Sequence, residues 1–185
     1  MTTDRPLSWS SLPETIRALG RWITIVQLVG YTTSLVFIRH TTGMTPAGVA
    51  TRYRGSDPDA AEGAMQFAKS FSEMLTVTHT HLFSMAAIFV FSGLALALCD
   101  RPSERWRHIL IVEPFAALLV SFSAMWLMRY SDARFSWLLA ASSALMAITF
   151  YVQCFFTLRE LMTRSPAAAC SGATFLAHSG PALVR

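Results

Sequence analysis

The sequence predicts an all-α membrane protein built as a bundle of four transmembrane helices. Apolar residues make up 53% of the 185 residues and charged residues only 14%, whereas a typical soluble domain has about 25% charged residues. The charge deficit falls in four runs, each close to the roughly 20 residues that cross about 30 Å of hydrocarbon as a helix. Only the third run holds a charge between its ends, at Glu113. The runs are residues 22–39, 81–99, 109–128 and 135–158.

The first run is expected to stay in the membrane as a helix. It begins some twenty residues into the chain. No small-x-small cleavage site precedes a soluble domain, so the run does not resemble a signal peptide. Residues 1–164 are therefore predicted to form a single domain. After Ser165 the chain reads Pro-Ala-Ala-Ala-Cys-Ser-Gly, which predicts a flexible tail over residues 165–185.

Residues 40–80 form the only sizeable piece that is predicted outside the membrane. Glycines and a proline over residues 41–57 indicate a loop, and Ser56–Asp59 is typical of a helix start. Helical spacing from Ala60 predicts an amphipathic helix over about residues 60–80 that leads into the second span. The alternative is a separate interfacial helix with a bend near Thr78–His81. The apolar stripe holds Phe67, Phe71, Met74, Leu75, Thr78, Leu82 and Met85, and the polar arc holds Glu62, Gln66, Lys69, Glu73, Thr76 and Thr80.

Basic residues near the helix ends predict the orientation, because arginine and lysine are enriched in short cytoplasmic loops. Their density favours a cytoplasmic location for both termini and for the 101–107 loop, in a bacterial inner membrane. Cys99, Cys154 and Cys170 then lie at or near the cytoplasmic face, where thiols stay reduced. We expect no disulfide, and no CxxC motif indicates a cysteine metal site.

The predicted outer ends of the first two spans carry histidine and methionine side chains. Histidine near hydrocarbon is a functional candidate, and imidazole and thioether are ligands of haem iron and copper. Residues two apart lie about 200° apart on a helix, so His79 and His81 cannot both bind one ion on a regular helix. His81 is predicted beside Met74 and Met85 on the buried stripe. We expect His81 and His40 to bind haem b or copper, with Met74 and Met85 lining the site. His79 is a hydrogen-bonding neighbour of the ligands, or the partner ligand of His81 if the helix bends. Met44 is a further methionine at the outer end of the first span. The packing alternative, with no cofactor, stays open.

A second polar layer is predicted near the opposite face of the membrane. Gln27, Glu113 and Gln153 each lie five or six residues inside the end of their run, which is roughly 8–9 Å deep. Pro114 has no N–H to donate and frees a backbone carbonyl nearby. The layer is either an interhelical polar clamp or a quinone or proton site, to which His108 at the edge of the third span could belong.

Three functions are compatible with these residues. The first is a membrane subunit of an electron-transfer complex, with a haem b or copper near the outer face and a redox partner protein. The second is an accessory or assembly subunit without a cofactor, and the third is a small carrier that uses Glu113.

Four helices with outer histidines are loosely similar to membrane b-type cytochromes, but the in-helix histidine pairs of those proteins are missing. Nucleotide-binding, nucleophile-elbow and HExxH motifs are absent, so we expect no independent catalytic activity. The basic residues form no stripe for nucleic acid, and the expected partners are lipids and other membrane subunits.

Overall fold

The fold is an all-α bundle, as the sequence predicts. The computed structural model describes residues 7–56 and 65–163, and every regular element within these ranges is helical. The elements are the short 3-10 helix η1 (Trp9–Ser11) and the helices α1 (Glu14–Thr42), α2 (Pro46–Arg54), α3 (Phe71–Ala97), α4 (Glu104–Tyr130) and α5 (Phe135–Met162).

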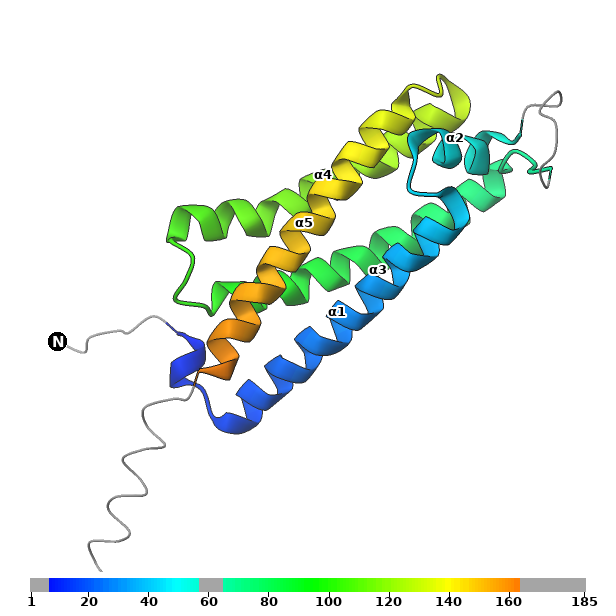
Figure 1. Cartoon of the computed structure of the whole chain (residues 1–185). Helices are drawn as coiled ribbons and strands as arrows, with labels where there is room; N and C mark the ends of the chain where they lie inside the picture. The colour runs from blue at the N-terminus through cyan, green and yellow to red at the C-terminus, as the bar shows by residue number, and fades with distance from the viewer. Residues whose placement is uncertain (1–6, 57–64, 164–185) are drawn as a thin grey trace, which may run out of the picture.

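Helices α1, α3, α4 and α5 are long and apolar enough to cross a membrane, which confirms the four predicted spans. Each has 27 to 29 residues and is therefore about 40 Å long, so the helix ends extend beyond a hydrocarbon core of about 30 Å. The four run side by side, with η1 and the last turn of α5 at one end and α2 at the other (Figure 1). We call these the Trp9 end and the α2 end.

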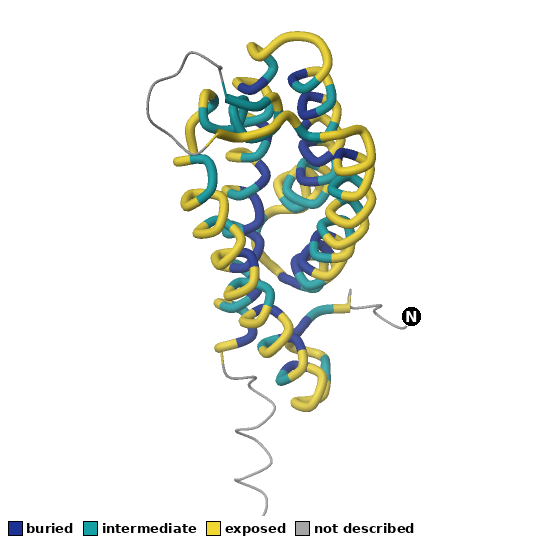
Figure 2. The backbone as a smooth tube through the Cα atoms, turned by 90° about the vertical axis from the view of Figure 1, so that its right-hand side faces the viewer, coloured by how far each residue is buried: buried dark blue, intermediate teal, exposed yellow. Residues whose placement is uncertain are grey.

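Small and aromatic side chains fill the core of the bundle (Figure 2). Helices α4 and α5 share the largest interface, where the hydroxyl oxygens of Ser121 and Ser142 lie 2.7 Å apart. Tyr31 of α1 stacks on Phe150 of α5 with ring centroids 4.3 Å apart. Phe89 of α3 is fully buried in the same cluster. Small residues at interfaces let transmembrane helices approach closely, so the chain forms a packed bundle.

The segment between the first two spans differs from the prediction. Residues 46–54, predicted as loop, form α2, which starts where the hydroxyl oxygen of Thr45 accepts from the N–H of Gly48 at 3.0 Å. Tyr53 of α2 packs against the Met74 cluster, and burial raises its pKa above the ordinary value. Residues 65–70 are not helical. The amphipathic helix therefore begins at Phe71 and not near Ala60, and the predicted start over residues 57–59 lies outside the described residues.

Helix α3 runs without interruption from Phe71 into the second span, so the alternative of a separate interfacial helix is wrong. Its buried face begins at Met74, which is fully buried with Met125 and Met128. Phe71 is 61% exposed and Leu75 is 49% exposed, so the predicted stripe is too wide. Apolar side chains are equally compatible with lipid and with protein, because lipid tails are as apolar as leucine.

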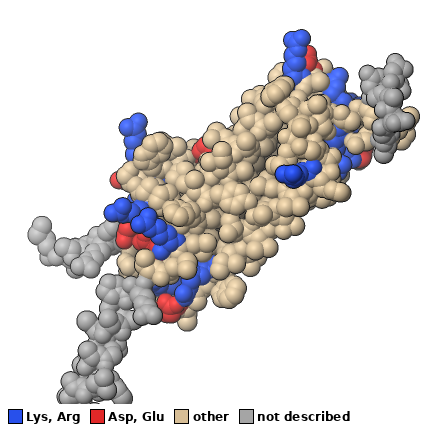
Figure 3. Space-filling model, viewed as in Figure 1, with Lys and Arg blue, Asp and Glu red and all other residues tan. Residues whose placement is uncertain are grey.

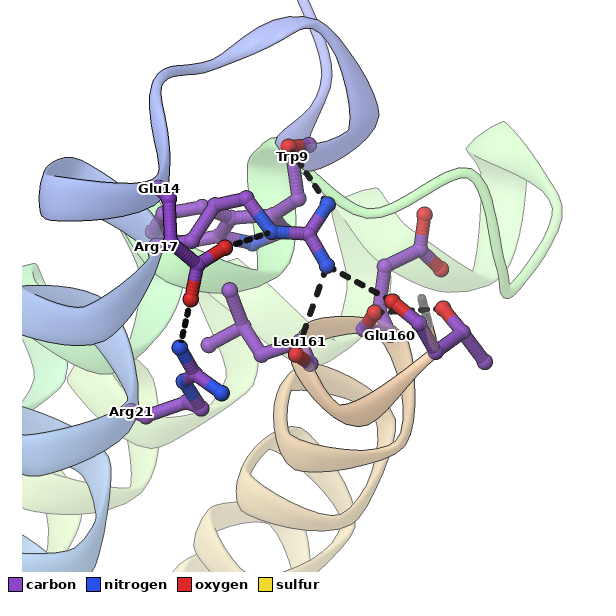
Figure 4. Close-up of polar contacts among 7 residues, drawn as sticks. Trp9, Glu14, Arg17, Arg21, Glu160 and Leu161 are labelled. Carbon is purple, nitrogen blue, oxygen red and sulfur yellow. Dashed lines mark hydrogen bonds and ion pairs between the residues drawn. The ribbon is translucent and has the colours of Figure 1, made fainter. Parts of the chain in front are cut away.

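Arg17 joins three segments at the Trp9 end (Figure 4). The side chain is 4% exposed, and its guanidinium donates to the carbonyls of Trp9 (3.2 Å), Leu161 (3.4 Å) and Thr163 (2.7 Å). Its Nε lies 3.4 Å from the carboxylate of Glu14. The last carbonyls of a helix have no helical donor, so the buried cation stabilises the end of α5.

Trp9 is buried at the same end of the bundle and packs against α1 and α3. Its indole N–H donates to the carbonyl of Ala95 at 2.8 Å, and its backbone N–H donates to Leu98 at 3.0 Å. Gly20 of α1 faces the ring so closely that a Cβ there would lie 2.6 Å from a Trp9 carbon. The N-terminal segment is thus packed into the end of the bundle.

Cys99 and Cys154 are buried free thiols. The predicted tail over residues 165–185, with Cys170, lies outside the described residues.

Candidate functional site

Glu113 and Gln153 lie at the same depth in the bundle. Glu113 is nine residues from the first residue of α4, Glu104, and Gln153 is nine residues from the last residue of α5, Met162. At 1.5 Å per residue each is about 13–14 Å from the Trp9 end of its helix. The Glu113 carboxyl and the Gln153 amide, which the sequence places in one layer, thus lie at the same depth on two neighbouring helices.

Pro114 explains the position of Gln153. Proline has no N–H, so the carbonyl four residues earlier, that of Leu110, loses its helical donor. The side-chain amide of Gln153 donates to the Leu110 oxygen at 2.6 Å. The predicted free carbonyl is therefore paired across the α4–α5 interface, and Gln153 is itself fully buried.

Glu113 lies in this layer without a hydrogen bond. Among the described residues, neither of its buried carboxylate oxygens has a partner, and the amide oxygen of Gln153 also has none. The amides that could clamp Glu113 bond elsewhere: Gln153 donates to Leu110, and Gln27 donates to the carbonyl of Ile88 at 3.4 Å. Unpaired buried polar groups are rare and costly. The layer therefore holds three of the four buried polar side-chain atoms that have no hydrogen bond within the described chain.

The unpaired atoms of the layer are all hydrogen-bond acceptors. A carboxylate accepts only, and an amide oxygen accepts only. A group that fits these acceptors is a proton, the hydroxyl group of a ligand or a cation. Tyr31 of α1 lies near this layer, because its ring stacks on Phe150 of α5.

Sequence reasoning missed Tyr31, although a signal was present. Tyr31 follows Gln27 by four residues in α1, so both side chains lie on the same face of the helix. Its ring is 5% exposed and stacks on Phe150, three residues before Gln153. His108, which the sequence links to this layer, is exposed near the start of α4.

The histidines at the α2 end have a different environment. His40 in the last turn of α1 and both His79 and His81 of α3 are exposed. The prediction that His81 lies on the buried face of α3 with Met74 and Met85 is wrong. Met74 is fully buried and Met85 packs against the core cluster, whereas His81 is exposed. The part of the chain that the structure describes contains no group of three His, Cys, Asp or Glu residues placed to hold a metal.

The ring of His81 is nevertheless oriented. Its Nδ1 lies 3.0 Å from the carbonyl oxygen of Val77, and because a carbonyl only accepts, Nδ1 carries the hydrogen. In the neutral ring this leaves the Nε2 lone pair free. The ring of His79 instead packs edge-on against the ring of Phe83, with the two ring centroids 5.4 Å apart.

Comparison with known proteins supports the membrane fold. Residues 43–168 match the family Aq_1264_TM, a transmembrane helical domain. No curated protein matches the chain, and no solved structure matches it. The matched range includes Glu113, Gln153 and His81 and leaves out the whole of α1, with Gln27, Tyr31 and His40. The chain therefore belongs to the Aq_1264_TM family of transmembrane helical domains.

Proposed function

We propose that this integral membrane protein is a subunit of an electron-transfer complex and that Glu113 is its proton-binding group. The observation that carries the proposal is the pair of buried Glu113 oxygens with no partner among the described residues. A bare carboxylate inside a membrane protein costs several kcal/mol. A bound proton removes that cost and turns one oxygen into a donor for a neighbour such as the amide oxygen of Gln153.

A proton fits this place better than a larger donor ligand. Two hollows of the described surface are lined by α2 with the start of α5, and by η1, α1 and α3. Neither is lined by Glu113. A quinol hydroxyl has the required donor chemistry, but its ring needs space between the helices that these hollows do not provide.

The test uses the full chain extracted with its partners in a mild detergent. A complex that transfers electrons from a soluble quinol is expected to work more slowly, with an altered pH profile, when Glu113→Gln is introduced. Glu104→Gln, an exposed change on the same helix, is the control and should leave the pH profile unchanged. A complex that contains no redox group would overturn the proposal. The chain would then be an accessory subunit.

A second candidate, a haem b or copper site at the α2 end, is favoured by the orientation of His81. Histidines that bind metals usually donate their other ring N–H to a carbonyl or carboxylate, and His81 has this arrangement with Val77. His40 would be its partner ligand. A visible spectrum of the gently extracted protein tests for haem, and elemental analysis tests for copper. A protein without either would contradict this site.

A further inference from the structure

We propose that the hollow between α2 and the start of α5 binds the phosphate of an anionic phospholipid. The hollow measures about 350 Å³, and Thr45, Ala47, Arg134, Ser136 and Trp137 are among its lining residues. It lies at the α2 end, where helix ends extend beyond the hydrocarbon. This site is independent of Glu113, which lies deep in the bundle.

Arg134 supplies the charge. Its side chain is exposed and forms no ion pair with the described residues. The neighbouring carboxylate of Asp132 accepts from the backbone N–H of Arg134 at 2.7 Å. The guanidinium is therefore available for a phosphate, which it binds through short charge-assisted hydrogen bonds.

Ser136 supplies a second donor from inside the hollow. The residue is only 4% exposed, yet it lines the hollow, and within residues 7–56 and 65–163 its hydroxyl has no hydrogen-bond partner. The Oγ atom is not among the fully buried unpaired atoms of the described chain, so it can be reached from the hollow. An oxygen-rich ligand in the hollow would satisfy it.

The first turn of α2 adds a backbone donor. Thr45 caps this helix by accepting from Gly48, and Pro46 has no N–H. The N–H of Ala47 remains without an acceptor among the described residues. Free N–H groups at a helix start favour phosphate. The hollow is thus lined by three residues that carry donors: the guanidinium of Arg134, the hydroxyl of Ser136 and the backbone N–H of Ala47.

The surroundings favour a lipid over free phosphate. Trp137 is 70% exposed, as expected for an indole at the headgroup level, and the rest of the lining is mostly alanine and proline. Basic side chains are numerous at this end (Figure 3). The exposed guanidinium of Arg134 lies in the same hollow as this indole, and a cation at the headgroup level attracts an anionic lipid.

The test is native mass spectrometry of the detergent-purified full chain, titrated with phosphatidylglycerol, phosphatidylcholine or inorganic phosphate. Phosphatidylglycerol should bind more tightly than phosphatidylcholine. Arg134→Gln should weaken this binding about tenfold, the effect of one charged hydrogen bond, and Ser136→Ala should weaken it less. Arg39→Gln removes the same charge at the same end of the bundle, outside the hollow, and should leave binding unchanged.

Two results would overturn the proposal. Equal losses in Arg134→Gln and Arg39→Gln would show attraction by overall charge. Equal binding of inorganic phosphate and phosphatidylglycerol would assign the site to free phosphate. Circular dichroism of each variant, compared with the wild type, shows whether the bundle is intact.

Discussion

The side-chain amide of Gln153 donates to the backbone oxygen of Leu110 at 2.6 Å, in place of the N–H that Pro114 lacks. A hydrogen bond between transmembrane helices contributes about 0.6–2 kcal/mol. Gln153→Leu should therefore destabilise the bundle by about 1 kcal/mol, measured as unfolding in detergent micelles. The bond also fixes the amide oxygen of Gln153 beside the buried layer.

A double-mutant cycle tests whether Pro114 is the reason for this bond. Pro114→Ala restores a helical N–H for Leu110, so Gln153→Leu should cost less in that background than in the wild type. Equal costs in the two backgrounds would contradict the pairing, because independent sites are additive.

Gly20 and Gly30 form a matched pair on α1. A Cβ at residue 20 would lie 2.6 Å from the Trp9 ring, whereas nothing lies within 4 Å of one at residue 30. Gly20→Ala should cost about 1–3 kcal/mol, as overpacking does, and should make the N-terminal segment more sensitive to protease. Gly30→Ala should be neutral or slightly stabilising, because alanine is the better helix former. Resistance to protease that is unchanged in Gly20→Ala would show that Trp9 does not pack there.

The haem or copper candidate makes a prediction for single histidines. His81→Ala and His40→Ala should each abolish the absorbance or the metal, because either change removes a ligand. His108→Ala should retain it, because His108 lies near the Trp9 end of α4. Absorbance that survives both ligand changes would exclude this pair.

The orientation in the membrane remains a prediction from basic-residue density. Ser103→Cys, in a variant without the native cysteines, places a single thiol beside the first turn of α4. A reagent that does not cross the membrane should fail to label it in intact cells and should label it after lysis. Labelling in intact cells would reverse the orientation.

The number of spans could be predicted because charges are scarce in four stretches of sufficient length. The start of α3 could not be predicted as easily, since Ser56–Asp59 and Ser70–Glu73 both resemble helix caps. The structure uses the second, where Ser70 and Glu73 form a reciprocal capping box. The N–H of Lys69 bonds to Tyr53 of α2, and this tertiary contact holds the preceding residues outside the helix.

Part of the buried polar layer can be predicted from the sequence. Glu113 and Gln153 stand out as polar residues inside apolar runs, and Pro114 indicates a free carbonyl. Tyr31 was missed because its contact with Phe150 depends on how α1 packs against α5. His81 was assigned to the wrong face because helical phase alone does not separate a face covered by protein from one covered by lipid.

Infrared difference spectroscopy tests the proton at Glu113 most directly. A protonated, buried carboxyl group has its own carbonyl stretch, which a carboxylate lacks. The wild type and Glu104→Gln should both show this band, and Glu113→Gln should lose it. A wild-type spectrum without the band, or a band that persists in Glu113→Gln, would contradict the assignment of Glu113 as the proton-binding group.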